Sequence, residues 1–302
     1  MNLLLTGCFQ YSEKQLKMLC ALGYNIHFMQ QEKDSLPIPA SEVDAIVCNG
    51  LFLNHNIEEF SRLKLIQLTS AGFDRVPVDI IKQKDIKLHN ARGVYSTPMA
   101  EWALFRVLEH YKQGWFFKQE QNLKKWTKHR GLREIAGTKV AVVGAGNVGQ
   151  EVAKRFQTMG AQTTGFDIHT IDTPFFDYMS LTKELEQHVS EFDVVVVTAP
   201  LLPSTKGLIS RSVLMSMKQD AVLVNIARGG LIDEQAMCDV LAQRKDLFAA
   251  LDVFEEEPLV KESSLWGYDN VAISPHNSFV SNGNNARMFD VIYNNLKQFI
   301  SK

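Results

Sequence analysis

The chain alternates short apolar runs with longer segments in which apolar residues recur every three or four positions. Short apolar runs are typical of strands buried on both faces of a parallel sheet, and the longer pattern is typical of helices that cover such a sheet. Up to about residue 94, the predicted strands are residues 3–5, 25–28, 45–48 and 65–68. A helical pattern at residues 12–22 follows the first of them. This region therefore predicts a small α/β domain with a mostly parallel sheet.

From residue 139 the same alternation resumes. The predicted strands are residues 140–143, 162–166, 192–198, 221–226, 247–251 and 271–273. A last helix is predicted at about residues 281–300, because its apolar residues Phe289, Ile292, Leu296 and Phe299 share one face. We therefore predict a second α/β region after the first.

A long helix is predicted from Pro98, with Thr97 as its cap. Apolar residues cover more than one of its sides, which indicates a place between domains or between subunits. Residues 112–134 then mix aromatic with basic side chains, a combination that also occurs in nucleic-acid-binding proteins. Because the basic cluster is short and the chain is not basic overall, we predict an arm that packs on a partner subunit and no nucleic-acid partner.

Length and composition support this organisation. With 302 residues, the chain exceeds the size of one ordinary core, so two domains are expected. The 45% hydrophobic and 22% charged residues are usual for a soluble globular protein. A net charge of −2 gives no reason to expect nucleic acid or an anionic membrane as a partner.

Targeting and metal-binding features are not evident in the sequence. The first residues, MNLLLTGCF, read as a strand rather than a signal peptide, and no apolar run approaches the length of a membrane span. We predict a cytoplasmic protein. The four cysteines are scattered without a CxxC pair, which predicts buried, reduced thiols and no metal site.

The sequence GAGNVG at residues 144–149 lies between a predicted strand and a predicted helix. In a dinucleotide-binding turn, Gly144 allows the tight turn, Gly146 lets the backbone approach the pyrophosphate, and Gly149 lets helix and strand pack closely. Asp167, 18 residues beyond Gly149 (167 − 149), follows the next strand and can accept hydrogen bonds from ribose hydroxyls. Because a carboxylate there repels a 2′-phosphate, we predict NAD(H) rather than NADP(H).

Other polar residues follow predicted strands, at the sheet edge where ligands bind. Arg228 can hold a carboxylate through two hydrogen bonds, His276 can transfer a proton near neutral pH, and Glu257 can hold the histidine ring in place. The turn TSAGFD at residues 69–74 can offer free amides to an anion. Each feature alone has an ordinary alternative: a surface arginine, a structural histidine, a solvated acidic loop or a plain glycine turn.

Seven motifs in order extend over nearly the whole chain: TSAGFD, MAEW, GAGNVG with Asp167, APLLPSTKGLI, VNIARGGLIDE, LDVFEEEP and SPH. Together they resemble the D-isomer-specific 2-hydroxyacid dehydrogenase family. The resemblance implies a catalytic triad of Arg228, Glu257 and His276, and a substrate carboxylate bound by Arg228 and by the amides of Ala71 and Gly72. It also implies that further residues line the cofactor site: Asn147, Val148, Pro200, Ile226, Ala227, Asp252 and Ser278.

The same resemblance implies the domain organisation. A Rossmann NAD-binding domain at residues 95–275 is expected to be inserted into a flavodoxin-like substrate domain, residues 1–94 and 276–302, both with doubly wound parallel sheets. The usual dimer of the family is formed through the cofactor domain and the helix from Pro98, so we expect a homodimer.

The expected activity is NAD(H)-dependent reduction of a small 2-oxo acid to a D-2-hydroxy acid, with His276 as general acid or base. The alternative is a non-enzymatic NAD(H)-sensing interaction protein, because corepressors use the same scaffold. The chain begins at its first predicted strand and ends at its last predicted helix, which favours the enzyme.

Overall fold

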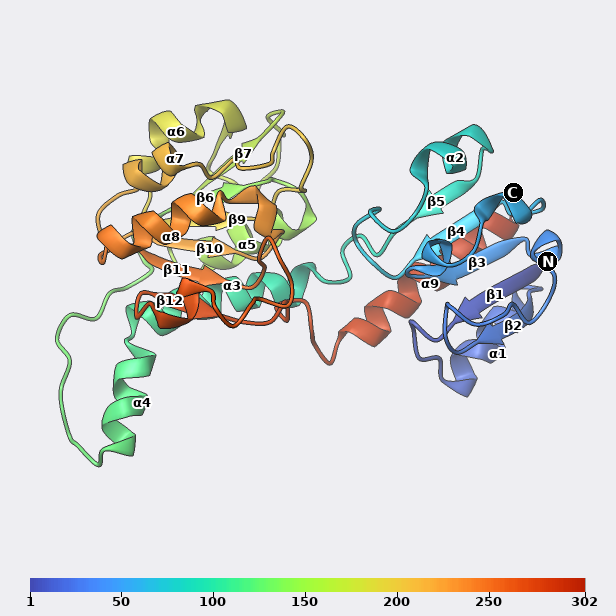
Figure 1. The fold of residues 1–302 in the computed structure, drawn as a ribbon, viewed down its shortest axis with the longest axis horizontal. Helices are drawn as coiled ribbons and strands as arrows, with labels where there is room; N and C mark the ends of the chain where they lie inside the picture. The colour runs from blue at the N-terminus through green and yellow to red at the C-terminus, as the bar shows by residue number, and fades with distance from the viewer. Residues whose placement is uncertain (302) are drawn as a thin grey trace. The chain divides into compact units, whose positions relative to one another are not determined.

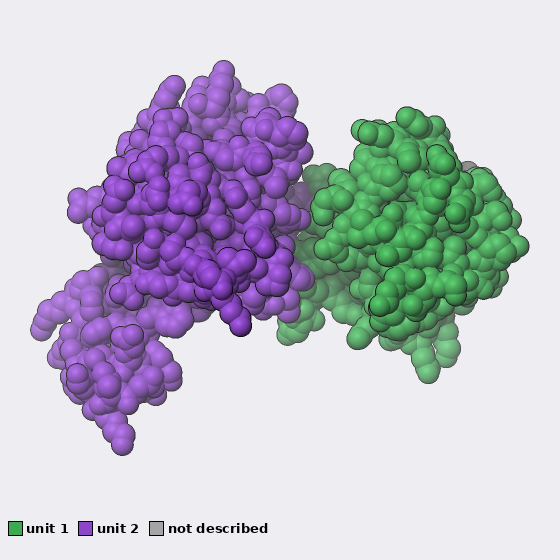
Figure 2. Space-filling view, in the orientation of Figure 1, with its two compact units in different colours: residues 1–95, 281–302 green, residues 96–280 purple. Residues whose placement is uncertain are grey.

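The structure is a computed structural model that describes residues 1–301. The chain forms two compact units, which are described separately (Figure 2). Unit 1 consists of Met1–Tyr95 and the segment from Ser281 onward, and unit 2 is Ser96–Val280. The chain re-enters unit 1 at Ser281 rather than at residue 276, because residues 276–278 are hydrogen-bonded to Asp252 of unit 2.

Unit 1 contains a five-stranded sheet in which all neighbouring strands are parallel, in the order β2-β1-β3-β4-β5. This is the flavodoxin-like order of a doubly wound sheet. The strands are β1 (Asn2–Thr6), β2 (Asn25–Met29), β3 (Ala45–Cys48), β4 (Leu65–Leu68) and β5 (Lys87–His89).

Both faces of this sheet are covered. On one face, α1 (Glu13–Ala21) and α9 (Asn284–Ile300) pack against strand residues such as Leu5 and Val47. On the other, α2 (Val78–Gln83) and the 3-10 helices pack against alternating strand residues. The 3-10 helices are η1 (Ala40–Glu42), η2 (Leu51–Leu53) and η3 (Ile57–Glu59).

Polar contacts fix α9 on the sheet of unit 1, although 228 residues separate the contacting Asn295 and Gln67 in the chain. Asn295 Nδ2 donates to Oε1 of the fully buried Gln67 at 2.6 Å. Tyr24 Oη donates to the carbonyl of Leu296 at 2.9 Å. The end of the chain is therefore part of the first unit's core.

Unit 2 contains a seven-stranded parallel sheet in the order β12-β11-β10-β9-β6-β7-β8. Its first six strands along the chain, β6 to β11, are arranged in the Rossmann order 3-2-1-4-5-6. The winding direction reverses between the neighbouring strands β6 and β9. The strands are β6 (Lys139–Val143), β7 (Gln162–Asp167), β8 (Tyr178–Leu181), β9 (Val194–Val197), β10 (Val222–Asn225), β11 (Phe248–Leu251) and β12 (Val271–Ile273).

Helices cover both faces of this sheet as well (Figure 1). One face packs against α3 (Ser96–Tyr111) and α5 (Asn147–Thr158). The other face packs against shorter helices: α6 (Leu185–His188), α7 (Arg211–Ser216) and α8 (Glu234–Gln243). The remaining 3-10 helices are η4 (Thr182–Glu184), η5 (Val189–Glu191), η6 (Gly229–Leu231) and η7 (Ser264–Gly267).

An arm of unit 2 projects from this body (Figure 1). It consists of α4 (Gly114–Asn122) and the irregular residues that follow. Arg133 ends the arm, because its guanidinium donates to Tyr111 Oη at 3.0 Å and to the carbonyl of Asp220 at 2.6 Å. Trp126 in the arm is 97% exposed.

The structure confirms the predicted α/β fold class, two doubly wound parallel-sheet domains, and adds details that the sequence analysis missed. The edge strands β5 and β8 were not predicted. Helix α3 begins at Ser96, so Thr97 lies inside it and is not its cap. The expectation of buried thiols is wrong for Cys8 and Cys20, which are exposed. Within residues 1–301, no helix has both the length and the apolar character needed to cross a membrane.

Candidate active site

The glycine-rich turn after β6 has the geometry of a dinucleotide cradle. Gly144 has φ +103°, and a Cβ there would lie 2.5 Å from the backbone nitrogen of Ala199. A Cβ on Gly149 would lie 2.0 Å from the carbonyl oxygen of Gly144, so no side chain fits where α5 meets the turn. A Cβ on Gly146 would meet nothing within 4 Å. The turn therefore leaves space for a ligand at Gly146 while its other two glycines are required by packing.

Asp167, at the end of β7, is fixed beside this turn. Its Oδ2 accepts a hydrogen bond from the amide of Ala145 at 2.7 Å, and its Oδ1 accepts one from the amide of Ile168 at 2.7 Å. Each oxygen keeps a further lone pair for a ligand hydroxyl. No lysine or arginine occurs in the next five residues, IHTID. The side chains on this stretch therefore offer carboxylates and no lysine or arginine.

His276 and Glu257 form a hydrogen-bonded pair in unit 2. His276 Nδ1 lies 2.7 Å from Glu257 Oε2, and the two side chains are 39% and 36% exposed. The other carboxylate oxygen, Oε1, accepts a hydrogen bond from the amide of Phe254 at 3.1 Å. Since a carboxylate can only accept, Nδ1 donates and Nε2 carries the lone pair in the neutral ring. Within the described part of the chain, Nε2 has no hydrogen-bond partner, so it is available to a substrate.

The backbone at His276 has an uncommon conformation, with φ +48°. The fully buried Asp252, directly after β11, holds it. The carbonyl of Asp252 accepts a hydrogen bond from the His276 amide at 2.8 Å. Its carboxylate accepts hydrogen bonds from the amides of Asn277 at 2.8 Å and Ser278 at 2.9 Å, and from the Ser274 hydroxyl. We call this set of hydrogen bonds the Asp252 clamp.

Arg228 lies in the loop after β10, next to the strand that leads to Asp252. The buried Asn225 braces this loop, because its Nδ2 donates to the carbonyl of Arg228 at 3.0 Å. A Cβ on Gly229 would lie 1.9 Å from the carbonyl carbon of Phe254, so the loops that carry Arg228 and Glu257 touch through their backbones. The Arg228 guanidinium donates to the carbonyl of Ala227 at 2.7 Å and forms no ion pair with a described residue. Its charge therefore remains available to an anion.

The turn after β4 in unit 1 offers free amides. The amides of Ala71 and Gly72 donate to no acceptor among the described residues. The turn is braced from both sides: Asn90 Nδ2 donates to the carbonyl of Ala71 at 2.6 Å, and Tyr95 Oη to the carbonyl of Thr69 at 2.5 Å. This arrangement suits the binding of a carboxylate.

A thiol adjoins the same turn. Cys8 is exposed on one side, yet the groups packed around its sulfur desolvate it and raise the pKa of the thiol from 9.0 to about 11. Hydrogen bonds with Thr6 and Thr69 act against this effect but are weaker. Cys8 therefore remains a neutral thiol near pH 7 and does not act as a nucleophile.

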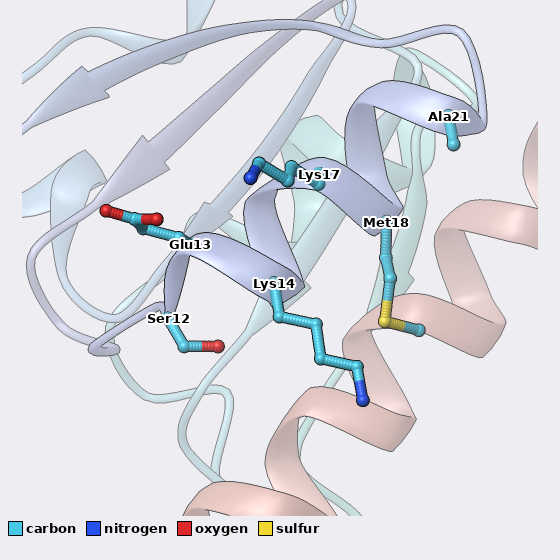
Figure 3. A pocket seen from close by; sticks show the side chains of 6 residues that line it. All are labelled: Ser12, Glu13, Lys14, Lys17, Met18 and Ala21. Atoms are coloured by element: carbon cyan, nitrogen blue, oxygen red, sulfur yellow. The ribbon is translucent and has the colours of Figure 1, made fainter.

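The remaining predicted cofactor residues all lie in unit 2, after strands or in the first turn of α5. These residues are Asn147, Val148, Pro200, Ile226, Ala227 and Ser278. A surface hollow on unit 1 contains no predicted site residue (Figure 3). Its lining comes from the whole length of α1 and its cap: Ser12, Glu13, Lys14, Lys17, Met18 and Ala21. From Met1 to Ser301, no group of His, Cys, Asp and Glu is arranged to hold a metal ion.

Sequence reasoning missed two supporting residues. Asn225 was not singled out, and Asp252 was assigned only to the cofactor lining rather than to the loop that carries His276. Both are polar residues that directly follow, or end, an apolar strand, and both are buried. A polar residue at the buried end of an apolar run was the feature that could have identified them.

Comparisons with known proteins show which family the chain resembles. Residues 104–278 match the family described as "D-isomer specific 2-hydroxyacid dehydrogenase, NAD binding domain". The chain is similar to a hydroxypyruvate reductase of Thermotoga maritima, with 34% identity over 254 residues, which are 81% of each protein. It is also 35% identical over 228 residues to a D-3-phosphoglycerate dehydrogenase of Methanocaldococcus jannaschii, which covers 73% of this chain but only 42% of that relative.

A solved structure shows the same architecture. A D-isomer-specific 2-hydroxyacid dehydrogenase family protein of Aeromonas salmonicida superposes with a TM-score of 0.84. It is 25% identical, and the match covers 99% of this chain and 95% of that one. The similarity thus includes both units and not only the region around the glycine-rich turn.

Proposed function

The chain belongs to the D-isomer-specific 2-hydroxyacid dehydrogenase family, and we propose that it is an NADH-dependent reductase of small 2-oxo acids that forms D-2-hydroxy acids. Membership makes it an oxidoreductase with a Rossmann-type NAD-binding domain. The substrate class, the product configuration and the preference for NADH are our proposals. The hydroxypyruvate reductase among its relatives supports a substrate of this size.

One observation carries the proposal: the hydrogen-bonded pair of His276 and Glu257, 2.7 Å apart, with Nε2 of the histidine free. Glu257 accepts the Nδ1 proton, which fixes the tautomer and the orientation of the ring. In the protonated ring, Nε2 can therefore give a proton to the oxygen of a 2-oxo acid as that oxygen gains charge, and take it back in the reverse reaction. Arg228 is assigned to the substrate carboxylate and to polarising the carbonyl.

The turn at residues 144–149 and Asp167 would hold the dinucleotide, the pyrophosphate at the open side of Gly146 and a ribose at the carboxylate. When bound, the nicotinamide supplies the hydride. The chain's own residues orient the 2-oxo acid and deliver the proton. In unit 1, the free amides of Ala71 and Gly72 are assigned to the substrate carboxylate.

The fixed charge of Asp167 supports NADH as the preferred cofactor. A 2′-phosphate at the adenosine ribose would meet a carboxylate held by two amides, with no lysine or arginine in the following five residues. NADPH would therefore bind more weakly than NADH.

We also propose a homodimer formed through unit 2. The arm exposes five large apolar side chains: Trp115, Phe117, Leu123, Trp126 and Leu132. Exposed apolar surface of this kind is typical of subunit interfaces. Light scattering measured on the protein as it elutes from a size-exclusion column should give twice the mass of one chain. A monomer at micromolar concentration would contradict the proposal.

The activity is tested by mixing the protein with NADH and a panel of 2-oxo acids, and following the loss of NADH absorbance. The expected result is turnover with at least one small 2-oxo acid and a product of D configuration by chiral chromatography. His276→Ala should lower kcat by roughly 10²–10⁴. The control His188→Ala changes an exposed histidine of the same unit and should leave kcat unchanged. Near-normal turnover in His276→Ala would remove that residue from the mechanism.

A further inference from the structure

Glu32, in the loop after β2, is held by three donors from two other segments of unit 1. Its Oε1 accepts hydrogen bonds from Thr6 Oγ1 at 2.7 Å and from the amide of Asn49 at 2.7 Å. Its Oε2 accepts one from the amide of Gly50 at 2.6 Å. Hydrogen bonds to a carboxylate are short and strong, so this charge occupies a fixed position at the carboxyl ends of β1 and β3.

This position is next to the turn assigned to the substrate carboxylate. β3 and β4 are parallel neighbours with Cys48 paired to Leu68, and the amide of Thr69 donates to the carbonyl of Cys48 at 2.9 Å. Asn49 therefore follows its strand about 4.8 Å from the start of the turn that carries the free amides. Cys8 lies beside Glu32, because the Thr6 hydroxyl is within hydrogen-bond distance of both the Cys8 sulfur, at 2.9 Å, and Glu32 Oε1, at 2.7 Å.

The two neighbouring strand ends thus differ in one respect. After β4, the amides of Ala71 and Gly72 are free, whereas after β3 the amides of Asn49 and Gly50 are already taken by a carboxylate of the protein. An anion bound at the first pair has a negative charge at the second pair as its neighbour.

Arg75 is a nearby cation. Its Cδ would lie 3.8 Å from a Cβ built on Gly50. However, the ion pairs found between Met1 and Ser301 do not include one between Arg75 and Glu32. No salt bridge in the described chain therefore neutralises the Glu32 charge.

We propose that Glu32 determines substrate specificity: its carboxylate selects 2-oxo acids with an uncharged substituent on C3 and rejects those with a second anionic group there. This inference rests on the proposed function, in which the substrate carboxylate binds at Ala71 and Gly72. C3 is only two carbon–carbon bonds from the carboxylate carbon, so its substituent reaches the neighbouring strand end. A hydroxyl there can donate to the lone pair that Glu32 still has free, whereas a phosphate, sulfonate or carboxylate is repelled.

The test compares kcat/KM for hydroxypyruvate with kcat/KM for oxaloacetate and for 3-phosphohydroxypyruvate. Glu32→Gln removes the charge and keeps the side-chain size. It should change this ratio in favour of the anionic substrates by about ten- to hundredfold, as expected for like charges about 5–8 Å apart in a partly solvated site. The control Glu59→Gln makes the same change in net charge at an exposed position of unit 1 and should leave the ratio within about twofold.

Two further measurements separate charge from loop geometry. Glu32→Asp keeps the charge, so it should keep the wild-type ratio to within about threefold. In the wild-type protein, the preference for hydroxypyruvate over the two anionic substrates should weaken as ionic strength rises, because salt screens the repulsion between Glu32 and the second anionic group. This measurement does not depend on whether a variant folds.

An unchanged ratio in Glu32→Gln with normal turnover of hydroxypyruvate would overturn this inference and leave the proposed function in place. An equal change in Glu32→Gln and Glu32→Asp, or no salt dependence, would also overturn it. Absence of turnover with every 2-oxo acid, with NADH binding retained, would overturn the proposed function and this inference with it.

Discussion

Asp252→Asn is the sharpest test of how the structure holds the histidine. The substitution keeps the size of the side chain but replaces one acceptor oxygen of the Asp252 clamp with an NH2 group. That group would face a donor, either the hydroxyl of Ser274 or the amide of Asn277 or Ser278. Hydrogen bonds to a charged acceptor contribute about 1.5–3 kcal/mol each, and an unsatisfied buried donor costs about 1–3 kcal/mol. We therefore expect a loss of about 2–4 kcal/mol in unfolding free energy.

The same change should lower activity through His276. Its left-handed backbone conformation is less favourable than the right-handed one by about 1–2 kcal/mol, and the clamp offsets this cost. A clamp weakened by about 2–4 kcal/mol leaves the histidine in other conformations for much of the time. Because about 1.4 kcal/mol corresponds to a factor of ten, a loss of about 2–4 kcal/mol should lower kcat by about thirty- to several-hundredfold.

Thermal unfolding and steady-state kinetics measure the two effects. For a domain of about this size, 1 kcal/mol corresponds to about 2–4 °C, so Tm should fall by about 5–15 °C. The control is Asp239→Asn on α8, which breaks an exposed ion pair with Arg211 and should change Tm by at most about 2 °C. If Asp252 acts through the histidine, Asp252→Asn should cost no further kcat in the His276→Ala background.

Either of two results would refute this reasoning. One is a Tm and kcat for Asp252→Asn equal to those of the Asp239→Asn control. The other is an equal loss of kcat in the wild-type and His276→Ala backgrounds, which would mean that Asp252 contributes to catalysis independently of the loop it holds.

Three further predictions concern unit 2. Gly149→Ala should destabilise it by about 1–3 kcal/mol or more through the clash with Gly144, whereas Gly146→Ala should leave Tm unchanged and weaken NADH binding measured by fluorescence; equal Tm losses would contradict the assignment of Gly146. Asp167→Ala should narrow the ratio of kcat/KM for NADH over NADPH, and an unchanged ratio would show that the carboxylate is not the discriminator. Burial, with the charge of Arg133 beside it, lowers the pKa of His110 from 6.5 to about 4. The unfolded chain therefore binds this proton first, and the contribution of His110 to stability, full above pH 6.5, is lost as pH falls toward 4; it amounts to about 1–3 kcal/mol after allowance for partial exposure. His110→Phe, which keeps the stacking on Phe248, should flatten Tm over this range, and an unchanged slope would contradict the prediction.

The central strands could be predicted from the sequence because they are buried on both faces. Runs such as residues 194–197, all valine, leave little alternative to an interior strand. The edge strands β5 and β8 are short and partly polar, since one side of an edge strand faces solvent. Their sequences therefore do not differ from those of loops, and the two strands can be recognised only from their hydrogen-bonded pairing with a neighbouring strand.

The candidate site could be predicted as a set of residues but not as a geometry. Motif spacing indicated His276 and Glu257, yet no pattern in the sequence predicts the left-handed backbone at a histidine. The predicted domain boundary at residue 275 differs from the boundary in the structure for the same reason, because the hydrogen bonds that hold the His276 loop are not visible in the sequence. It follows the end of β12, whereas the structure keeps residues 276–280 in unit 2 through hydrogen bonds to Asp252, which is 24 residues earlier (276 − 252).

The return of the chain to unit 1 has a consequence for its synthesis. The ribosome releases the five strands of unit 1 first, but α9, one of the two described helices on one face of their sheet, comes last, with Ile292 and Leu296 among its buried residues. Until α9 emerges, α1 is the only one of these helices on that face and part of the face stays uncovered, while unit 2 is continuous in sequence and can fold as it appears. Nascent chains that stop before α9 should therefore contain a folded unit 2 and an incomplete unit 1 with exposed apolar surface. We expect chaperones to bind this surface during translation.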